Sequence, residues 1–365
     1  MANLKDVAKE AGVSVSTASL VLNKAKGSER ISPECVEKVK KTAAKLGYIR
    51  NYHHSSIRTG RSQTIGFAIA LIEKMRSKYP YYSPVNDRYL ANIITGVEAA
   101  AHKEGYDLNL FGNTEEEENV LERGITSIKA GRFDGIVIAG SHLTPNMINF
   151  LGDTPALPMV VIEPCFPTSL PSVDFNFDGG IRLIVRHLAE LGHRDLAWLG
   201  EMVDDGADNP RWSACREQVF IREAWDHGIK GFSYRIQAKH MVFQIDRYIK
   251  AVGEAVEAIL AEKKHFTALV CFNDLIAAVA CRTLLKHHIK IPGDIAVVGF
   301  DNLESVIANP PLTTIDHKLP LMGERAGELL LEMIKGGADK MKEKAGSVEI
   351  VEPALIVRES TAGEK

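Results

Sequence analysis

The chain has few cysteines, and no two of them are spaced like the ligands of a metal or the partners of a redox pair. Five cysteines occur in 365 residues, and they are scattered: Cys35, Cys165, Cys215, Cys271 and Cys281. Metal and dithiol sites place cysteines a few residues apart. The scatter predicts reduced, structural thiols, and we expect neither a metal nor another cofactor.

Long apolar runs are also missing. No run approaches the roughly 20 residues that a membrane-spanning helix needs. Lys5, Asp6, Lys9 and Glu10 interrupt the N-terminal segment, so it has no apolar core of a secretory signal. We therefore expect a cytoplasmic protein without a membrane partner. Its hydrophobic content of 45% and charged content of 25% are ordinary for a globular protein.

Charge is unevenly distributed along the chain. Residues 1–62 hold 12 Lys and Arg against 5 Asp and Glu, a net charge of +7. Residues 63–365 hold 32 against 42, a net charge of −10. A basic N-terminal part on an acidic remainder indicates that a polyanion binds at the N-terminal end.

The basic part begins with two short helical patterns, from Leu4 to Asn23. The first has an apolar face made by Leu4, Val7, Ala8 and Ala11 and is expected to end at Gly12. Ser14 can cap a second helix, whose buried stripe is Ala18, Val21 and Leu22. An ordinary packed helix pair is the alternative. The small hydroxyl residues of the second helix and the basic charge favour instead a helix-turn-helix that enters the major groove of DNA.

A third helix and a linker follow. Ser32 and Pro33 suit a helix start, and Gly47 suits its end. Residues 48–62 are polar and basic, with the composition of a linker that becomes helical on DNA. His53 and His54 lack cysteine or carboxylate partners nearby, so we reject a metal site there.

From residue 64 onward, apolar strand-like runs alternate with helical patterns. The expected strands are Thr64–Ile72, Leu108–Phe111, Gly135–Ala139, Met159–Ile162, Leu196–Leu199, Ala268–Cys271 and Ile295–Gly299. The expected helices are Leu90–Lys103, Glu116–Ala130, Gly180–Leu191, Val219–His227, Ile249–Lys263 and Leu275–His287. This alternation is typical of parallel α/β sheets covered on both faces, and it fits two lobes better than one closed barrel.

Seven segments, in order along nearly the whole chain, resemble the lactose-repressor/galactose-repressor (LacI/GalR) family of bacterial transcription regulators. They are Asp6-Val7-Ala8 with Gly12 to Ser19, Leu46-Gly47-Tyr48 with Asn51, Arg58 to Ser62 with Thr64-Ile65-Gly66, His187 to His193, Phe272-Asn273-Asp274, Val297 to Asp301, and Pro310 to Ile315.

The resemblance implies an α/β protein with a helix-turn-helix head at 1–50, a hinge at 51–62 and a two-lobed core at 63–365 like periplasmic sugar-binding proteins. The chain is expected to cross between lobes near 174–176, 315–317 and 345–347. The N-terminal lobe would then comprise about 63–175 and 316–346, and the C-terminal lobe about 176–315 and 347–360.

In the head, the resemblance implies a set of DNA-binding residues. Val15, Ser16 and Leu20 fall where the family reads base edges. Leu20 stands where arginine is common, so it can offer only apolar contact, unless it is a packing residue. Ile57 falls where the family inserts a leucine into the minor groove. The others are Asn3, Leu4, Thr17, Ser19, Asn23, Ser32, Tyr48 and Asn51, of which Thr17, Ser19, Asn23 and Ser32 would lie near phosphates.

In the core, the resemblance implies an effector bound between the lobes. The mixed polar and aromatic candidates there favour a sugar or glycoside. Arg216 can hold hydroxyls or a carboxylate, and Asp301 can accept from two sugar hydroxyls. Asn273 can bind the ligand or cap a helix. Tyr89 can stack on a sugar, Glu163 and Trp212 are further candidates, and Asp274 is expected to be structural.

We expect a homodimeric transcription regulator, and a repressor rather than an activator. It would bind a pseudo-palindromic operator in double-stranded DNA and be switched by the effector. An enzyme is one rival, because His193-Arg194-Asp195 imitates a kinase triplet. The chain has no Gly-rich phosphate loop and no Asp-Phe-Gly, so we expect no catalytic activity. A transport receptor is the other rival, but it would need an export signal and no DNA-binding head.

Overall fold

The computed structural model describes residues 2–22, 30–48, 60–69, 87–112, 120–140, 143–154, 157–201, 213–236, 245–262, 264–303 and 305–362. The chain divides into two compact units, residues 1–62 (the head) and residues 63–365 (the core). Each unit has its own hydrophobic core.

The head is built from three helices, α1 (Leu4–Ala11), α2 (Val15–Leu22) and α3 (Pro33–Lys45). Gly12 ends α1 with a φ of 67°, a left-handed conformation that glycine adopts at little cost. The backbone N–H of Thr17 donates to Ser14 Oγ at 3.0 Å, and that of Cys35 donates to Ser32 Oγ at 3.3 Å. Both predicted caps are therefore confirmed.

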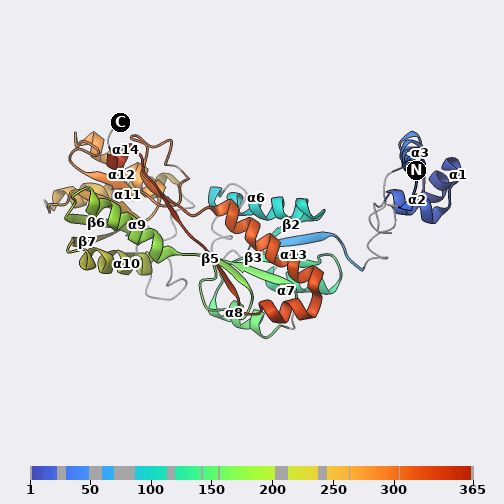
Figure 1. Ribbon diagram of the computed structural model, residues 1–365. Coiled ribbons are helices and arrows are strands. Elements are labelled where there is room, and N and C mark those ends of the chain that lie inside the picture. Colours follow the sequence, from blue (N-terminus) through green and yellow to red (C-terminus); the bar gives the residue numbers. More distant parts are fainter. Residues whose placement is uncertain are drawn as a thin grey trace. The chain divides into compact units, whose positions relative to one another are not determined.

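Two parallel sheets form the two lobes of the core (Figure 1). The first sheet has the order β11-β5-β4-β3-β1-β2, with strands β1 (Thr64–Ile69), β2 (Asp107–Gly112), β3 (Gly135–Ala139), β4 (Met159–Ile162), β5 (Ser172–Phe175) and β11 (Val348–Val351). The second has the order β7-β6-β8-β9, with β6 (Asp195–Glu201), β7 (Lys230–Ile236), β8 (Ala268–Cys271) and β9 (Ala296–Val298). All pairings within these two sheets are parallel, as the alternating pattern predicts.

Helices cover both sheets. The first lobe carries α6 (Arg88–Lys103), α7 (Val120–Lys129), α8 (Pro145–Gly152) and α13 (Leu319–Lys344). The second lobe carries α9 (Phe177–Glu190), α10 (Ser213–Asp226), α11 (Ile245–Ala261), α12 (Asp274–Lys286) and α14 (Glu359–Ala362). None of the helices in the described part of the chain has both the length and the apolar character needed to cross a membrane.

The chain passes between the lobes at three places. β5 leads into α9, and β10 (Thr314–Asp316) leads into α13, close to the expected first and second crossings. β10 pairs antiparallel with β12 (Ala354–Ile356). The third crossing differs from the prediction, because β11 still pairs with β5 of the first sheet. It lies after Val351 rather than at 345–347, so residues 348–351 do not belong to the second lobe.

Helices α6 and α13 lie side by side on the first sheet (Figure 1). Glycines bring their backbones close together, since a Cβ on Gly96 would lie 1.9 Å from the carbonyl oxygen of Pro320. A Cβ on Gly323 would lie 2.0 Å from the carbonyl oxygen of Ile93. The helix pair therefore requires glycine at both positions.

Candidate functional site

Polar side chains converge where the strands of both core sheets end. Glu163 directly follows β4, Glu201 ends β6, and Asp301 lies three residues after the end of β9. His317 follows β10, at the second crossing. The carboxyl ends of parallel strands are where open α/β sheets bind ligands. These residues, together with Tyr89, Arg216 and Tyr248, are called the inter-lobe cluster below.

Arg216 is the central cation of this cluster. It lies in the first turn of α10 and is only 5% exposed. Its guanidinium carbon lies 4.4, 4.5 and 4.7 Å from the ring centroids of Phe300, Phe272 and Phe177. Nη1 donates to the backbone oxygen of Phe272 at 2.9 Å, and burial lowers the pKa of the side chain. The Nε atom is buried with no hydrogen-bond partner among the described residues.

Tyr89 and Glu163 form a pair on the first lobe. Tyr89 lies in the first turn of α6, and its hydroxyl donates to Glu163 Oε1. Burial raises the pKa of the Tyr89 hydroxyl well above its usual value, and the Glu163 carboxylate raises it further. Burial also raises the pKa of Glu163 to about 7, against the lowering effect of the Tyr89 hydrogen bond. Glu163 can thus change its protonation near neutral pH.

Asp301 and His317 lie opposite each other, with Oδ1 and Nε2 3.0 Å apart. Neither atom has a hydrogen bond of acceptable geometry within the described residues. Burial lowers the pKa of His317 well below its usual value, so this ring is neutral. Burial raises the pKa of Asp301 to about 7, against the lowering effect of Arg216.

Glu201 and Tyr248 form the corresponding pair on the second lobe. The Tyr248 hydroxyl donates to Glu201 Oε1 at 2.5 Å, and burial raises the pKa of both groups. Asn273 lowers the pKa of the Tyr248 hydroxyl, against the effect of burial. Its own side-chain oxygen caps α12 by accepting from the N–H of Ile276 at 2.9 Å. Capping, the alternative considered for Asn273, is thus one of its roles.

The structure brings together four of the six predicted effector residues, Arg216, Asp301, Glu163 and Tyr89. Asn273 lies beside them as a cap, and Trp212 lies outside the described residues. Asp274 is structural as expected, since its carboxylate accepts from Thr314 Oγ1 at 2.6 Å and from the N–H of Leu303 at 2.8 Å. Sequence reasoning missed Glu201, Tyr248 and His317. The end of a predicted strand was the available signal for Glu201, and the second crossing was the signal for His317.

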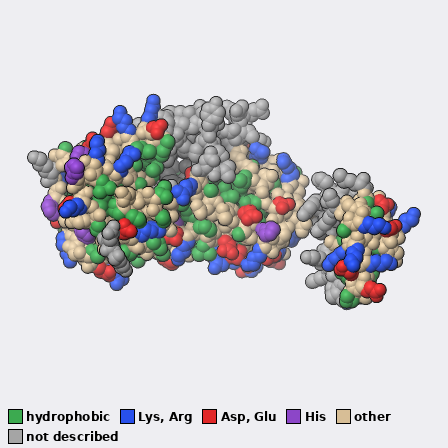
Figure 2. All heavy atoms as spheres, turned by 90° about the horizontal axis from the view of Figure 1, so that it is seen from above, with side chains coloured by type: hydrophobic (Ala, Val, Ile, Leu, Met, Phe, Trp, Pro, Cys, Tyr) green, Lys and Arg blue, Asp and Glu red, His purple; other side chains and the backbone are tan. Residues whose placement is uncertain are grey.

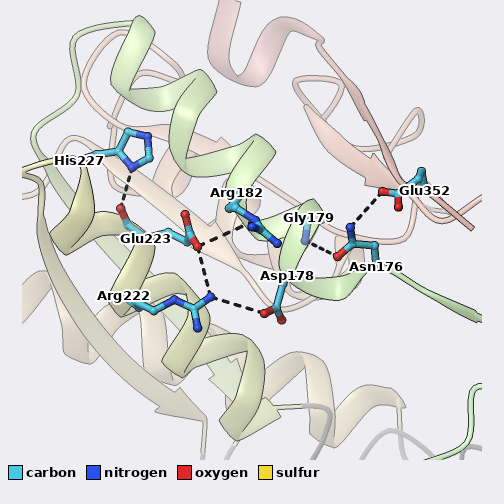
Figure 3. A network of polar contacts seen from close by, with 8 residues as sticks. All are labelled: Asn176, Asp178, Gly179, Arg182, Arg222, Glu223, His227 and Glu352. Atoms are coloured by element: carbon cyan, nitrogen blue, oxygen red, sulfur yellow. Dashed lines mark hydrogen bonds and ion pairs between the residues drawn. The ribbon is translucent and has the colours of Figure 1, made fainter. Parts of the chain in front are cut away.

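A polar network fastens α10, which carries Arg216, to α9 (Figure 3). Glu223 is 9% exposed as a side chain, and its Oε1 lies 3.2 Å from Arg222 Nη2 and 4.0 Å from Arg182 Nε. Arg222 also reaches Asp178 Oδ2 at 3.5 Å. At the start of α9, Asn176 caps the helix and donates from Nδ2 to Glu352 Oε2 at 3.0 Å, which joins the first and third crossings.

Replacement of Glu223 by alanine is expected to lower the free energy of unfolding of the core by about 1 kcal/mol. The effect is moderate because Arg182 and Arg222 are half-exposed and regain water. Chemical denaturation measures it. Glu190→Ala, which breaks the exposed Arg186–Glu190 pair on α9, is the control and should change stability by less than about 0.5 kcal/mol. Equal losses for both variants would contradict a special role for Glu223.

Part of the predicted DNA-contacting set lies on the surface of the described head, whereas Leu4 and Tyr48 pack on its hydrophobic core. Val15 is 43% exposed, Ser16 is exposed, and Thr17, Ser19 and Leu20 are half-buried. The partly buried hydrophobic side chains that pack on the head core are Leu4, Val13, Leu22, Ile31, Cys35, Val36, Leu46 and Tyr48. Leu20 is half-buried, so its burial alone does not distinguish a base-reading from a packing role. Asn3 and Ser32 are helix caps, whereas Asn23, Asn51 and Ile57 lie outside the described residues.

The distribution of charged side chains differs between the two units on the face that Figure 2 shows. Several Lys and Arg side chains lie close together on the head, with acidic ones beside them. On the core, acidic and basic side chains are interspersed.

Comparisons with known proteins cover both units. Residues 3–51 match the family model described as bacterial regulatory proteins, lacI family, and residues 185–361 match a periplasmic binding protein-like domain. The HTH-type transcriptional repressor PurR of Aliivibrio fischeri (strain MJ11) is 31% identical over 368 residues, which cover 99% of this chain and 98% of that protein.

Solved structures agree in fold. The Lac repressor dimer bound to operator and the anti-inducer ONPF aligns with a TM-score of 0.72 at 23% identity, over 99% of each chain. The complex of the transcriptional regulator CelR with cellobiose aligns with a TM-score of 0.60 at 23% identity, over 99% of this chain and 100% of that one. With both family models and a relative matched along its whole length, this chain belongs to the LacI family of DNA-binding bacterial transcription regulators.

Proposed function

We propose that the protein is a homodimeric repressor whose affinity for operator DNA is switched by a polyhydroxylated effector, a sugar or glycoside, bound in the inter-lobe cluster. The observation that carries the proposal is that buried polar side chains of both lobes converge around Arg216, and that some polar atoms of the cluster have no hydrogen-bond partner among the described residues. Such groups are costly unless a ligand satisfies them. They include Arg216 Nε, Asp301 Oδ1 and His317 Nε2.

The residue types fit hydroxyl groups. Carboxylates of Glu163, Glu201 and Asp301 accept from hydroxyl donors, and Arg216 donates to hydroxyl oxygens. The aromatic rings around Arg216 offer surface for the C–H face of a sugar. The cellobiose complex named above shows that a sugar occupies a related regulator.

A switch follows from the position of the cluster. Tyr89 and Glu163 belong to the first lobe, whereas Glu201, Arg216 and Tyr248 belong to the second. A ligand that bonds to both lobes stabilises one relative arrangement of the lobes over others, and its effect is limited to that difference in affinity. We propose that this difference is passed to the paired heads through the hinge at 51–62.

A dimer would suit the DNA-binding role. One helix-turn-helix reads a short half-site, and a twofold pair matches a palindromic operator. Sedimentation of the purified protein tests the dimer, and a monomer at micromolar concentration would contradict it.

The effector role is tested by a thermal-shift screen of a sugar library, followed by titration of each stabilising sugar into an operator-binding assay. We expect one sugar to raise the melting temperature and to change operator affinity. Asp301→Asn should abolish both effects, whereas Asp153→Asn, at the exposed end of α8, should abolish neither. If no sugar stabilises the protein, the sugar assignment fails.

In the head, Leu20→Ala is expected to weaken binding to the operator by about 1 kcal/mol, or roughly fivefold, because one apolar contact to a base is lost. Binding to unrelated DNA should not change, since phosphate contacts supply it. Filter binding at one salt concentration measures both. An equal loss on operator and unrelated DNA would mean that Leu20 supports the head rather than reading a base.

A further inference from the structure

Four side chains of the inter-lobe cluster lie in contact one after another, from the first lobe to the second. The Tyr89 hydroxyl, on α6, donates to Oε1 of Glu163, which directly follows β4. The same hydroxyl lies 3.2 Å from Nδ1 of His317, and Nε2 of that ring lies 3.0 Å from Asp301 Oδ1. Glu163 and Asp301 are thus joined end to end through one hydroxyl group and one imidazole ring.

Aromatic rings hold the His317 ring in place between the two lobes. It stacks on Phe175 of β5, with 4.0 Å between the ring centroids and 27° between the planes. Its edge contacts with Phe177, at the start of α9, and with Phe300 have centroid distances of 6.1 and 4.9 Å. His317 is fully buried, so a rotation of the ring would require these neighbours to move. A change in the roles of its two nitrogens is therefore a change in the position of a proton.

The number of protons in this chain of contacts is limited. Burial lowers the pKa of His317 well below its usual value, so the ring is neutral and has one N–H group. Burial raises the pKa of Tyr89 well above its usual value, so the hydroxyl keeps its single proton. Each of the two groups can therefore donate once, and the direction of one hydrogen bond fixes the direction of the next.

When Glu163 is ionised, the hydrogen bonds run toward the first lobe. Tyr89 donates its proton to the Glu163 carboxylate, so the tyrosine oxygen accepts from the Nδ1–H of His317. The other ring nitrogen, Nε2, then has no proton and faces Asp301 Oδ1 as an acceptor. The structure agrees with this state, since neither Nε2 nor Oδ1 forms a hydrogen bond with any described residue.

When Glu163 is protonated, the direction is reversed. The Glu163 carboxyl then donates to the Tyr89 oxygen, and the tyrosine hydroxyl turns its proton toward Nδ1 of His317. The single N–H of the neutral ring must then lie on Nε2, from which it donates to Asp301. The change requires protons to move along contacts that the structure already contains.

We propose that Tyr89 and His317 form a relay between the lobes, in which the protonation of Glu163 sets whether His317 Nε2 is an acceptor or a donor beside Asp301. Both are positioning residues in this relay. The inference rests on the proposed function only for what is regulated, the hydrogen bonds offered to an effector. With Glu163 ionised, Nε2 and Oδ1 are two acceptors for hydroxyl donors, and with Glu163 protonated they bond to each other.

The relay changes state near neutral pH. Burial raises the pKa of Glu163 to about 7, against the lowering effect of its hydrogen bond from Tyr89. Neighbouring charges shift the midpoint of the change but supply none of the three contacts. The charged groups that act on members of the relay from the surrounding elements are Arg216, Asp87, Asp174, Glu201 and Asp316.

Nitrogen-15 NMR of the full-length protein, labelled at its histidine side chains, measures the tautomer of His317. The variant His317→Gln assigns the signal by its loss. At pH 8, one unit above a pKa of about 7, ionised Glu163 exceeds the protonated form about tenfold, so Nδ1 should carry the proton. At pH 6 the ratio is inverted, and Nε2 should carry the proton of a ring that is still neutral.

Matched variants locate the relay. Tyr89→Phe keeps the aromatic ring and removes the hydroxyl, whereas Glu163→Gln removes the titrating group. In both variants the tautomer of His317 should be the same at pH 8 and at pH 6. Tyr248→Phe and Glu201→Gln break the corresponding hydroxyl–carboxylate pair of the second lobe. Because that pair is not part of the relay, the change of tautomer should remain in both controls.

A wild-type tautomer that is the same at both pH values, or a doubly protonated ring at pH 6, would overturn the inference. A change of tautomer that persists in Tyr89→Phe would also overturn it. The measurement needs no ligand, so failure of every sugar in the screen would remove the proposed function and leave the relay. A sugar that binds to a protein whose His317 never changes tautomer would leave the function and remove the relay.

Discussion

Arg216→Ala is expected to abolish the effector response, with a loss of ligand affinity of about 100-fold. One charge-assisted hydrogen bond contributes about 1.5–3 kcal/mol, and each 1.4 kcal/mol is a factor of ten. The variant also removes the guanidinium group that packs against the rings of Phe177, Phe272 and Phe300. The three rings then lose the contact that they share at the site. Calorimetric titration of the stabilising sugar measures the affinity.

The same substitution should change the proton balance of the site. Arg216 lowers the pKa values of Glu163 and Asp301, which are nevertheless raised to about 7 by burial. Without the arginine both pKa values rise further, and the folded variant binds more protons at pH 7. Because the folded state then holds protons that the unfolded chain releases, stability should fall as the pH rises through 7 more steeply than in the wild type.

Two controls separate binding from folding. Arg222→Ala removes an exposed arginine from the same helix and should leave ligand affinity within about threefold of the wild type. Arg216→Lys keeps the charge but not the planar group, and should retain only part of the affinity. If Arg216→Ala folds and still binds the sugar normally, the cluster around Arg216 is not the effector site.

Among the core strands, the bounds of those that are continuous apolar runs were predicted most accurately from the sequence. β3, β4 and β8 have the bounds that their patterns indicate, because each is buried on both faces. β5 and β10 were not predicted as strands. β5 contains Ser172 and Asp174, and β10 has only three residues. Their pairing with distant strands decides their structure, and a local pattern does not contain that information.

Helix α13 was also not predicted, although it is the longest helix of the core. Pro320 stands in its first turn, and Gly323 and Gly327 interrupt the apolar pattern. In isolation the two glycines weaken a helix, whereas the proline suits its first turn. Here the glycines are needed because α6 lies against them, so a tertiary contact overrides the local preference.

Prediction of the site was limited in a similar way. Asp301 was found because it follows a strand, and Arg216 because of the family pattern. Tyr248 lies in the first turn of α11 with no exposure, so its sequence position cannot be distinguished from that of a core residue. Its role depends on Glu201, 47 residues away, which accepts its hydrogen bond. Such long-range pairs require coordinates.

The second large effect is expected for Gly96→Ala, which should lower the free energy of unfolding of the core by about 3 kcal/mol or more. Alanine normally favours a helix over glycine by about 1 kcal/mol. At this position its Cβ would lie 1.9 Å from Pro320 O and 2.7 Å from Glu324 N. Both are backbone atoms of α13, so no side chain can rotate away, and the two helices must separate.

Thermal and chemical denaturation measure the effect, with Gly253→Ala as the matched control. Gly253 is also a helical glycine, but its nearest neighbour to a new Cβ is Thr283 Oγ1 at 3.7 Å, an ordinary contact. This control should be neutral or stabilising by up to about 1 kcal/mol. An unchanged melting temperature for Gly96→Ala would show that α6 and α13 are not packed as closely as the structure has them.

Gly323→Ala provides an independent test of the same helix contact from the other side. Its Cβ would lie 2.0 Å from Ile93 O and 3.0 Å from Val97 N, so we expect a loss similar to that of Gly96→Ala. The double variant should lose less than the two single losses together, because the first substitution already separates the helices that the second would strain. Full additivity would mean that the two glycines act on separate contacts. A smaller combined loss would assign both to one α6–α13 interface, which ties the helix carrying Tyr89 to the helix that begins two residues after His317.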